Sequence, residues 1–175
     1  MSTRVLVTYA SKYGATAEIA EKIAEVLSQA GLQIDLLPIE QVADLKPYQA
    51  VVLGTAIYIG RWRKAAVKFL KQYEEVLARE AVWIFASGPT GDDEISDSSE
   101  AWHVSKKLQS VLEHIAPREL KLFHGAIDTN KLTSLDKWLI NRVKAPVGDF
   151  RNWQAITSWA TEVATELKKS TLQVA

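Results

Sequence analysis

Short apolar runs alternate with helix-period segments along the whole of this 175-residue sequence. The apolar runs have the length of buried strands, whereas the segments between them repeat apolar residues every three or four positions, which is typical of helices. The alternation indicates a parallel sheet, because consecutive parallel strands need a helical crossover. We therefore expect an α/β fold, a doubly wound sheet of five parallel strands with helices on both faces, in a single domain spanning residues 1–175. The expected strands are Val5–Ala10, Gln33–Pro38, Ala50–Thr55, Ala81–Ser87 and Glu119–Ala126.

Helical spacing predicts the elements between these strands. Apolar residues recur from Ile19 to Leu27, and Gly31 is placed to end that helix. Further helices are expected over Ala65–Leu77, around Trp102–Ile115 and over Trp153–Leu167. In a doubly wound sheet, ligands bind beyond the carboxyl ends of the strands. The loops that follow the strands are therefore the candidate binding loops.

The first of these loops joins the first strand to the first helix. The N–H groups of a first helical turn have no internal partner, and the helix dipole favours negative charge there, so this turn can bind an anion. Ser11 and Thr16 add hydroxyl donors, and Lys12 adds a charge. The alternative is an ordinary turn in which Thr16 only caps the helix. The residues of this candidate anion site are Ser11, Lys12, Tyr13, Gly14, Ala15 and Thr16.

The composition of this loop narrows the class of ligand. It lacks the G-x-x-x-x-G-K-[ST] pattern of nucleotide triphosphatases and the G-x-G-x-x-G pattern of dinucleotide sites, so neither ATP nor NAD is indicated. A loop with one glycine and several hydroxyls suits a phosphate monoester better than a pyrophosphate. The loop therefore favours a mononucleotide.

Glycine-containing loops also follow the third and fourth strands. Glycine lets a backbone approach a flat ring closely, so that N–H groups can bond to its polar edge. Tyr58 and Trp62 are the aromatic residues that we expect to stack on such a ring. The candidate site residues are Thr55, Ala56, Ile57, Tyr58, Ile59, Gly60 and Trp62 from one loop, and Ser87, Gly88, Pro89, Thr90, Gly91 and Asp92 from the other.

Composition excludes several classes of function. The formal net charge is zero and no basic tail is present, so no nucleic-acid partner is expected. Cysteine is absent, which excludes disulfides, thiolate zinc sites, cysteine-bound iron–sulfur clusters and a cysteine nucleophile. The three histidines are not spaced to share a metal, so no metal site is expected. With no leader pattern and no apolar run long enough to span a bilayer, we expect a cytoplasmic protein.

Taken together, the three loops resemble those of a known family. A strand followed by S-K-Y-G-A-T and a helix, then G-T-A-I-Y-I-G, then S-G-P-T-G, is similar to the FMN-binding loops of the flavodoxin-like family. The resemblance covers essentially the whole chain. The segments Val51–Phe69, Phe123–Ala126 and Ala145–Trp153 resemble the branch related to menaquinone-dependent protoporphyrinogen dehydrogenase.

The resemblance implies a fold, a cofactor and a reaction. The fold is a flavodoxin-like sheet with strand order 2-1-3-4-5. The cofactor is FMN, with its phosphate in the first loop and its isoalloxazine ring between the other two. The reaction is oxidation of protoporphyrinogen IX, with menaquinone as the electron acceptor. Because Arg61, Arg63 and Lys64 follow the second loop, they are candidates to face the propionates of the substrate.

Departures from the family pattern keep alternatives open. Tyr13 stands where the usual flavodoxin loop has a hydroxyl residue that donates to phosphate, which leaves open a flavin-free, partner-binding module. A flavodoxin-type electron carrier or a general quinone reductase is a further alternative. Electron-carrier flavodoxins are strongly acidic, whereas this chain is neutral, so the carrier is the less favoured of these.

The basic fold does not need the segment Asp128–Asp149 (about residues 128–150), which we call the insertion. Apolar residues at helical spacing and basic residues between Lys131 and Lys144 predict a short amphipathic helix within it. The first interpretation is that its apolar stripe packs on the edge of the sheet. The second is that this cationic helix contacts the inner face of a membrane, where a lipid quinone would be met. The stripe consists of Leu132, Leu135, Trp138, Leu139 and Val143.

Overall fold

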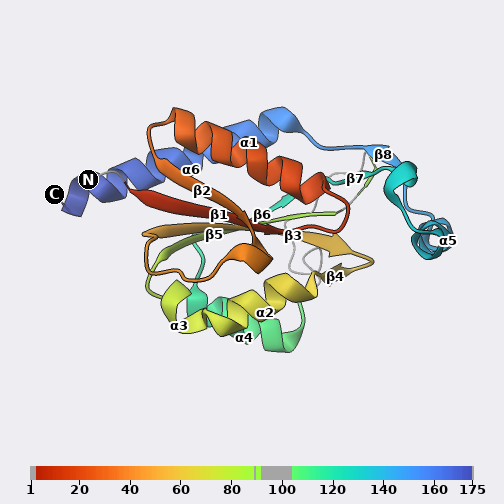
Figure 1. The fold of residues 1–175 in the computed structure, drawn as a ribbon, viewed down its shortest axis with the longest axis horizontal. Helices are drawn as coiled ribbons and strands as arrows, with labels where there is room; N and C mark the ends of the chain where they lie inside the picture. The colour runs from red at the N-terminus through yellow and green to blue at the C-terminus, as the bar shows by residue number, and fades with distance from the viewer. Residues whose placement is uncertain (1–2, 89, 92–103, 175) are drawn as a thin grey trace.

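The computed structural model describes residues 3–88, 90–91 and 104–174. Five strands run parallel in the order β2-β1-β3-β5-β6, which confirms the predicted order of the five parallel strands (Figure 1). Each of the central strands is apolar on both faces, as a parallel sheet covered on both sides requires. The bounds are β1 Arg4–Ala10, β2 Gln33–Pro38, β3 Ala50–Tyr58, β5 Ala81–Ser87 and β6 Glu119–Phe123.

Three very short strands depart from the expectation. β4 (Arg61–Trp62) folds back antiparallel on the end of β3, so the second binding loop is a hairpin. The predicted fifth strand, Glu119–Ala126, is interrupted: β6 ends at Phe123, and Ala126 belongs to β7 (Ala126–Ile127). β7 pairs with β8 (Gly148–Asp149) in a separate antiparallel ribbon. These two strands bring the two ends of the insertion together.

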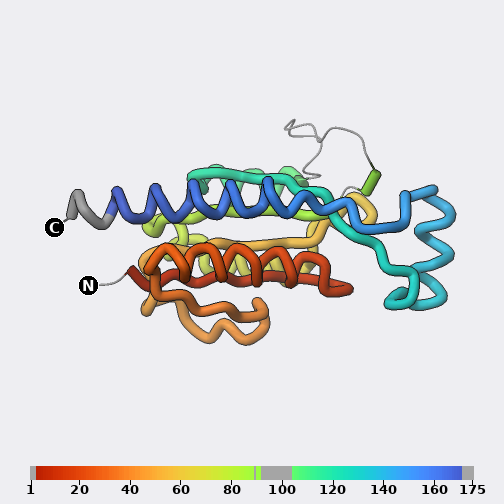
Figure 2. The backbone as a smooth tube through the Cα atoms, turned by 90° about the horizontal axis from the view of Figure 1, so that it is seen from above, coloured from red at the N-terminus to blue at the C-terminus, as the bar shows by residue number. Residues whose placement is uncertain are grey.

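Helices cover both faces of the sheet, as expected (Figures 1 and 2). On one face, residues of α1 and α6 pack with Val5, Val7 and Trp83. On the other, residues of α2, α3 and α4 pack with Leu6 and Leu53. The helix predicted over Ala65–Leu77 is divided at Tyr73. The bounds are α1 Ala15–Gln29, η1 Ile39–Gln41, α2 Lys64–Gln72, α3 Glu74–Leu77, α4 Lys106–Ile115 and α6 Trp153–Val174; the predicted start of α4 near Trp102 lies outside the described residues.

The insertion folds beyond the carboxyl ends of the strands. Between β7 and β8 it forms η2 (Thr129–Lys131) and α5 (Ser134–Val143), and both views place α5 at that end of the molecule (Figures 1 and 2). No helix within the described ranges is long and apolar enough to cross a membrane.

The prediction that the apolar stripe of the insertion packs on the sheet edge is wrong for most of the stripe. Leu135 is 66% exposed, Trp138 53% and Val143 54%, whereas the buried residues of α5 are Asp136 and Ile140. The reason is that the helix is rotated so that a carboxylate, and not the apolar stripe, faces the domain.

Candidate flavin site

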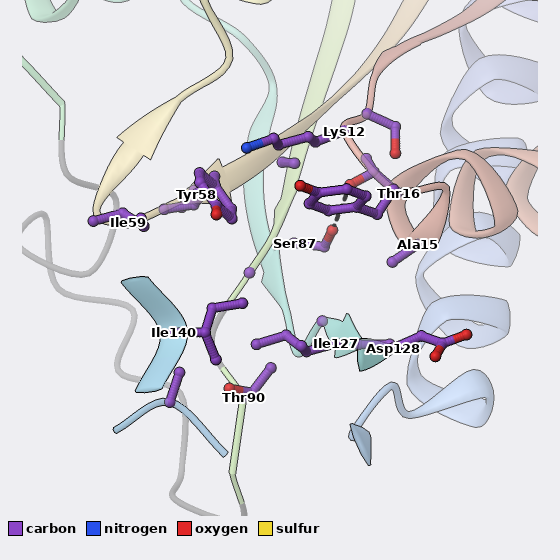
Figure 3. Close-up of a pocket in the computed structure, with 18 of the residues that line it drawn as sticks. Lys12, Ala15, Thr16, Tyr58, Ile59, Ser87, Thr90, Ile127, Asp128 and Ile140 are labelled. Atoms are coloured by element: carbon purple, nitrogen blue, oxygen red, sulfur yellow. Dashed lines mark hydrogen bonds between the residues drawn. The ribbon is translucent and has the colours of Figure 1, made fainter. Parts of the chain in front are cut away.

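A cavity of about 160 Å³ lies beyond the carboxyl ends of β1, β3 and β5 (Figure 3). All three predicted binding loops contribute to its lining, together with the segment after β6 and the insertion. The lining residues are Ser11, Lys12, Tyr13, Ala15, Thr16, Ala56, Ile57, Tyr58, Ile59, Ser87, Gly88, Thr90, Gly125, Ala126, Ile127, Asp128, Leu132, Ile140, Val143 and Ala145. The structure thus brings together loops that are far apart in the sequence.

The loop between β1 and α1 has the geometry of an anion site. Gly14 adopts φ +95°, and its N–H donates to the Ser11 hydroxyl over 3.0 Å. The first helical hydrogen bond runs from the Glu18 amide to the Gly14 carbonyl, so the amides of residues 15–17 precede it. The sequence alternative in which Thr16 caps the helix is wrong. Gly14 is the N-cap residue, and the buried Thr16 hydroxyl instead lies 2.8 Å from the Ser87 hydroxyl (Figure 3).

Lys12 and Tyr13 are held by a residue that the sequence analysis did not single out. Asp136 of α5 accepts hydrogen bonds from the Lys12 ammonium (2.8 Å) and from the Tyr13 hydroxyl. The Lys12 ammonium also lies 3.9 Å from the centre of the Tyr58 ring. The charge of Lys12 is therefore paired with the Asp136 carboxylate. The only sequence signal for Asp136 is its place three residues after Thr133, a spacing typical of a helix start. In the structure the Thr133 hydroxyl caps α5 by accepting a hydrogen bond from the Asp136 amide.

The second loop is the β3–β4 hairpin. Ile59 and Gly60 form its two-residue turn with φ of +47° and +64°, which is the backbone pattern of a type I′ turn. A β-branched residue rarely adopts positive φ, so Ile59 is held there under strain. Ala56, Ile57 and Tyr58, which precede this turn, line the cavity together with Ile59, whereas Gly60 does not. Thr55 is fully buried and does not line the cavity; its hydroxyl accepts from the Arg63 amide, which closes the base of the hairpin.

Trp62 lies elsewhere, so the prediction that it stacks on the ring is wrong. It is 6% exposed and belongs to the hydrophobic core on the α2 side of the sheet. Trp62 pairs with Ile57 in the hairpin, and Ile57 packs against the same core cluster. Arg61 and Lys64 are exposed, and Arg63 is partly exposed.

The third loop follows β5, and Ser87, Gly88 and Thr90 line the cavity from it. Gly91 adopts φ +112°. The predicted site residues Pro89 and Asp92 lie outside the described residues.

A second hollow of about 370 Å³ adjoins the first on the side of the insertion. Arg151 lines it and is tied to Glu18 of α1 (2.5 Å) and to Asp149 of β8 (2.7 Å). The hydrogen bond from Arg151 holds the pKa of Asp149 below its ordinary value, against the opposing effect of burial. The two hollows share a wall formed by Tyr13, Ala15, Ala126, Ile127 and Asp128.

The fold and the cavity together define a class of protein: a doubly wound α/β domain with a cavity, the candidate ligand site, beyond the ends of β1, β3 and β5. Residues 6–152 match the family described as Flavodoxin domain, and the chain belongs to that family. Solved structures of a flavodoxin from an archaeon (TM-score 0.60, 15% identity, 95% of this chain and 99% of that one) and of a Pseudomonas aeruginosa flavodoxin (TM-score 0.58, 17%, 95% and 99%) have the same fold.

Two kinds of relative are found among characterised proteins. A protoporphyrinogen IX dehydrogenase (quinone) of Escherichia coli K12 is 22% identical over 97% of this chain and 99% of that protein. An NAD(P)H dehydrogenase (quinone) of Paraburkholderia phymatum is 36% identical, but the match covers 39% of this chain and 46% of that protein. The chain therefore spans about half the length of the NAD(P)H dehydrogenases that it matches.

FMN is the cofactor of this domain, and the residues present fit it. The helix N-terminus behind Gly14, with the Ser11 hydroxyl, supplies donors for a phosphate group. Ile57 and Tyr58 supply an apolar and aromatic wall for a flat ring. Bound FMN supplies the ring that accepts and donates electrons, while the protein binds and orients it. Family membership argues against the flavin-free alternative.

Proposed function

We propose that this protein is an FMN-dependent oxidoreductase that oxidises protoporphyrinogen IX to protoporphyrin IX and delivers the electrons to a quinone, menaquinone. One observation carries the proposal. The likeness to the Escherichia coli protoporphyrinogen IX dehydrogenase covers 97% of this chain and so spans the insertion, the segment that distinguishes this chain from a minimal domain of the fold.

The place of the insertion supports this proposal. Leu132, Ile140, Val143 and Ala145 of the insertion form part of the cavity wall. A cavity walled in part by an added apolar segment suits chemistry on an apolar substrate or a quinone better than exchange of electrons with a large protein surface. The absence of a strong acidic charge also separates this chain from electron carriers, whose charge steers them to basic partners.

The test is anaerobic turnover of protoporphyrinogen IX by the FMN-loaded protein, followed by porphyrin fluorescence with and without a menaquinone analogue. We expect fluorescence to rise only when both the flavin and the quinone are present. A flat trace from protein with reducible, bound FMN would refute the substrate. Oxidation of NADPH by the same sample with a quinone would instead support a general quinone reductase, the activity named for the Paraburkholderia relative.

Arg61, Arg63 and Lys64 are proposed to attract the substrate propionates. In the same assay we expect the double variant Arg61→Glu and Arg63→Glu to raise the KM for protoporphyrinogen IX roughly 5- to 30-fold. The reason is that each exposed charge contributes about 1 kcal/mol to substrate binding. FMN affinity should not change, since neither side chain lines the described cavity. Lys68→Glu, on the exposed side of α2, is the control for a general charge effect. Equal loss of substrate binding and FMN binding would mean that Arg61 and Arg63 stabilise the structure and do not bind the substrate.

A further inference from the structure

Asp136 is a buried carboxylate surrounded by hydrogen-bond donors. Its side chain is 7% exposed, and it accepts from Lys12 (2.8 Å), Tyr58 (2.5 Å), Thr133 (2.7 Å) and the Tyr13 hydroxyl. Hydrogen bonds to an ionised acceptor are stronger than neutral ones, and a buried carboxylate that loses its donors is costly. The arrangement is therefore rigid for as long as the carboxylate keeps these partners.

Three of the four donors come from two loops that are separate from the insertion. Lys12 and Tyr13 lie between β1 and α1, and Tyr58 lies at the end of β3, whereas Asp136 belongs to the insertion. The rings of Tyr13 and Tyr58 meet edge to face, with centroids 6.3 Å apart, and the Lys12 ammonium lies over both rings. One side chain of the insertion thus ties together the loop between β1 and α1 and the β3–β4 hairpin.

The volume of the cavity shows why this tie matters for the cofactor. The cavity of about 160 Å³ is smaller than the roughly 300–1,000 Å³ of typical ligand pockets. The second hollow, of about 370 Å³, lies across the shared wall. Tyr13 is the largest residue of that wall, and its hydroxyl is the group that Asp136 holds. Movement of the Tyr13 ring would join the two hollows into one space.

We propose that Asp136 is a positioning residue for the flavin: it holds Tyr13 in the shared wall and the insertion against the cavity, and so sets how fast FMN enters and leaves. The proposal rests on the FMN dependence in the proposed function, but not on the identity of the substrate. When the Tyr13 hydroxyl is released from Asp136, the Tyr13 ring can move out of the shared wall, and FMN can both enter and leave through it. Loss of this contact therefore speeds association of FMN as well as its dissociation.

The experiment measures both rates by FMN fluorescence, which is quenched on binding. Dissociation is followed after dilution of the FMN-loaded protein, and association by mixing FMN with protein from which the flavin has been removed. Asp136→Asn keeps the size of the side chain but removes the charge that Lys12 and the two tyrosines share. Tyr13→Phe keeps the ring and removes the single hydroxyl that Asp136 holds. Asp44→Asn, an exposed loop carboxylate bonded to the Lys46 amide, is the matched control.

We expect both rates to rise about tenfold in Asp136→Asn and at least threefold in Tyr13→Phe, with no change in Asp44→Asn. Faster dissociation without faster association would overturn the proposal, because it would indicate only a damaged site. Unchanged rates in Tyr13→Phe would also overturn it, even if Asp136→Asn fails to fold. Because no substrate is present, failure of porphyrinogen oxidation would refute the substrate and leave the role of Asp136 standing.

Discussion

Gly88 has no room for a side chain. A Cβ atom at this position would lie 2.4 Å from the Ile57 carbonyl oxygen and 2.9 Å from the Ile57 Cβ. The nearest obstacle is backbone, which cannot rotate away. Close contact between the second and third loops therefore depends on glycine at this position.

The variant Gly88→Ala should weaken FMN binding about tenfold or more, equivalent to about 1.4 kcal/mol, because it forces apart two loops that line the cavity. The measurement is FMN titration by fluorescence, with thermal unfolding in parallel. Gly31→Ala is the control: Gly31 has φ +88° and open space around it, so this variant should lose about 1 kcal/mol of stability and keep its FMN affinity. Wild-type FMN affinity in Gly88→Ala would show that FMN binding does not depend on the close contact between the second and third loops.

At the scale of elements, the insertion is fastened to the domain through Arg151. The Arg151 side chain is 8% exposed and joins Asp149 of β8 to Glu18 of α1, while its guanidinium also donates to the Ala15 carbonyl. The Asp149 hydrogen bond is the main reason that the pKa of Arg151 is raised. The ion pairs place the end of the insertion beside the first turn of α1, next to the loop between β1 and α1.

Stability should depend on pH through this pair. Because the pKa of folded Asp149 lies below its ordinary value of 3.8, its contribution is full above that value and is lost as pH falls through the folded pKa. Asp149 is 49% exposed, so we expect only about 0.5–1 kcal/mol after solvent screening. The measurement compares the unfolding free energies of wild type and Asp149→Asn at neutral and at acid pH.

The difference in unfolding free energy between wild type and Asp149→Asn should be constant near neutral pH. It should shrink at acid pH as the Asp149 carboxyl group is protonated. In an Arg151→Met background the Asp149→Asn substitution should have little effect at any pH. A difference that persists undiminished at acid pH would show that Asp149 acts through something other than its charge.

At the scale of the whole molecule, the insertion exposes large apolar side chains that do not pack in the core. We name this exposed face the insertion surface: four exposed apolar residues with basic residues between and beside them. Arg142 lies over the Trp138 ring, 5.3 Å from its centre. An apolar face bordered by cations fits an anionic membrane surface, and we propose a peripheral contact there. The members are Leu135, Trp138, Val143 and Val147, with Lys131, Lys137, Arg142 and Lys144.

Sedimentation with vesicles that contain anionic phospholipid tests this contact. We expect the protein to sediment with these vesicles at low salt, to bind less at high salt, and to bind roughly tenfold less as the double variant Leu135→Ala and Trp138→Ala. Val76→Ala, at an exposed apolar residue of α3, is the control. Wild-type protein that stays in the supernatant at every salt concentration would refute the proposal.

The sequence predicted most of the fold and the three loops of the site. The bounds of β5 match the prediction because its apolar run is a local signal of a buried strand. The bounds of β2 also match, although β2 is an edge strand that contains Gln33 and Asp35. The loops after β1, β3 and β5 were predicted correctly to lie together, because the topology of a parallel sheet places the carboxyl ends of its strands at one edge.

Only the tertiary structure decided how side chains distant in sequence meet. The aromatic ring of Trp62 is of the kind that stacks on a flat ligand, but Trp62 packs in the hydrophobic core. The apolar stripe of the insertion has the composition of a buried face, but the rotation of α5 leaves most of it exposed. Asp136 lies 124 residues from Lys12, and no periodicity within either segment reports that pairing. Local sequence patterns record the environment of each element, whereas the contacts that close the flavin site depend on how separate elements pack together.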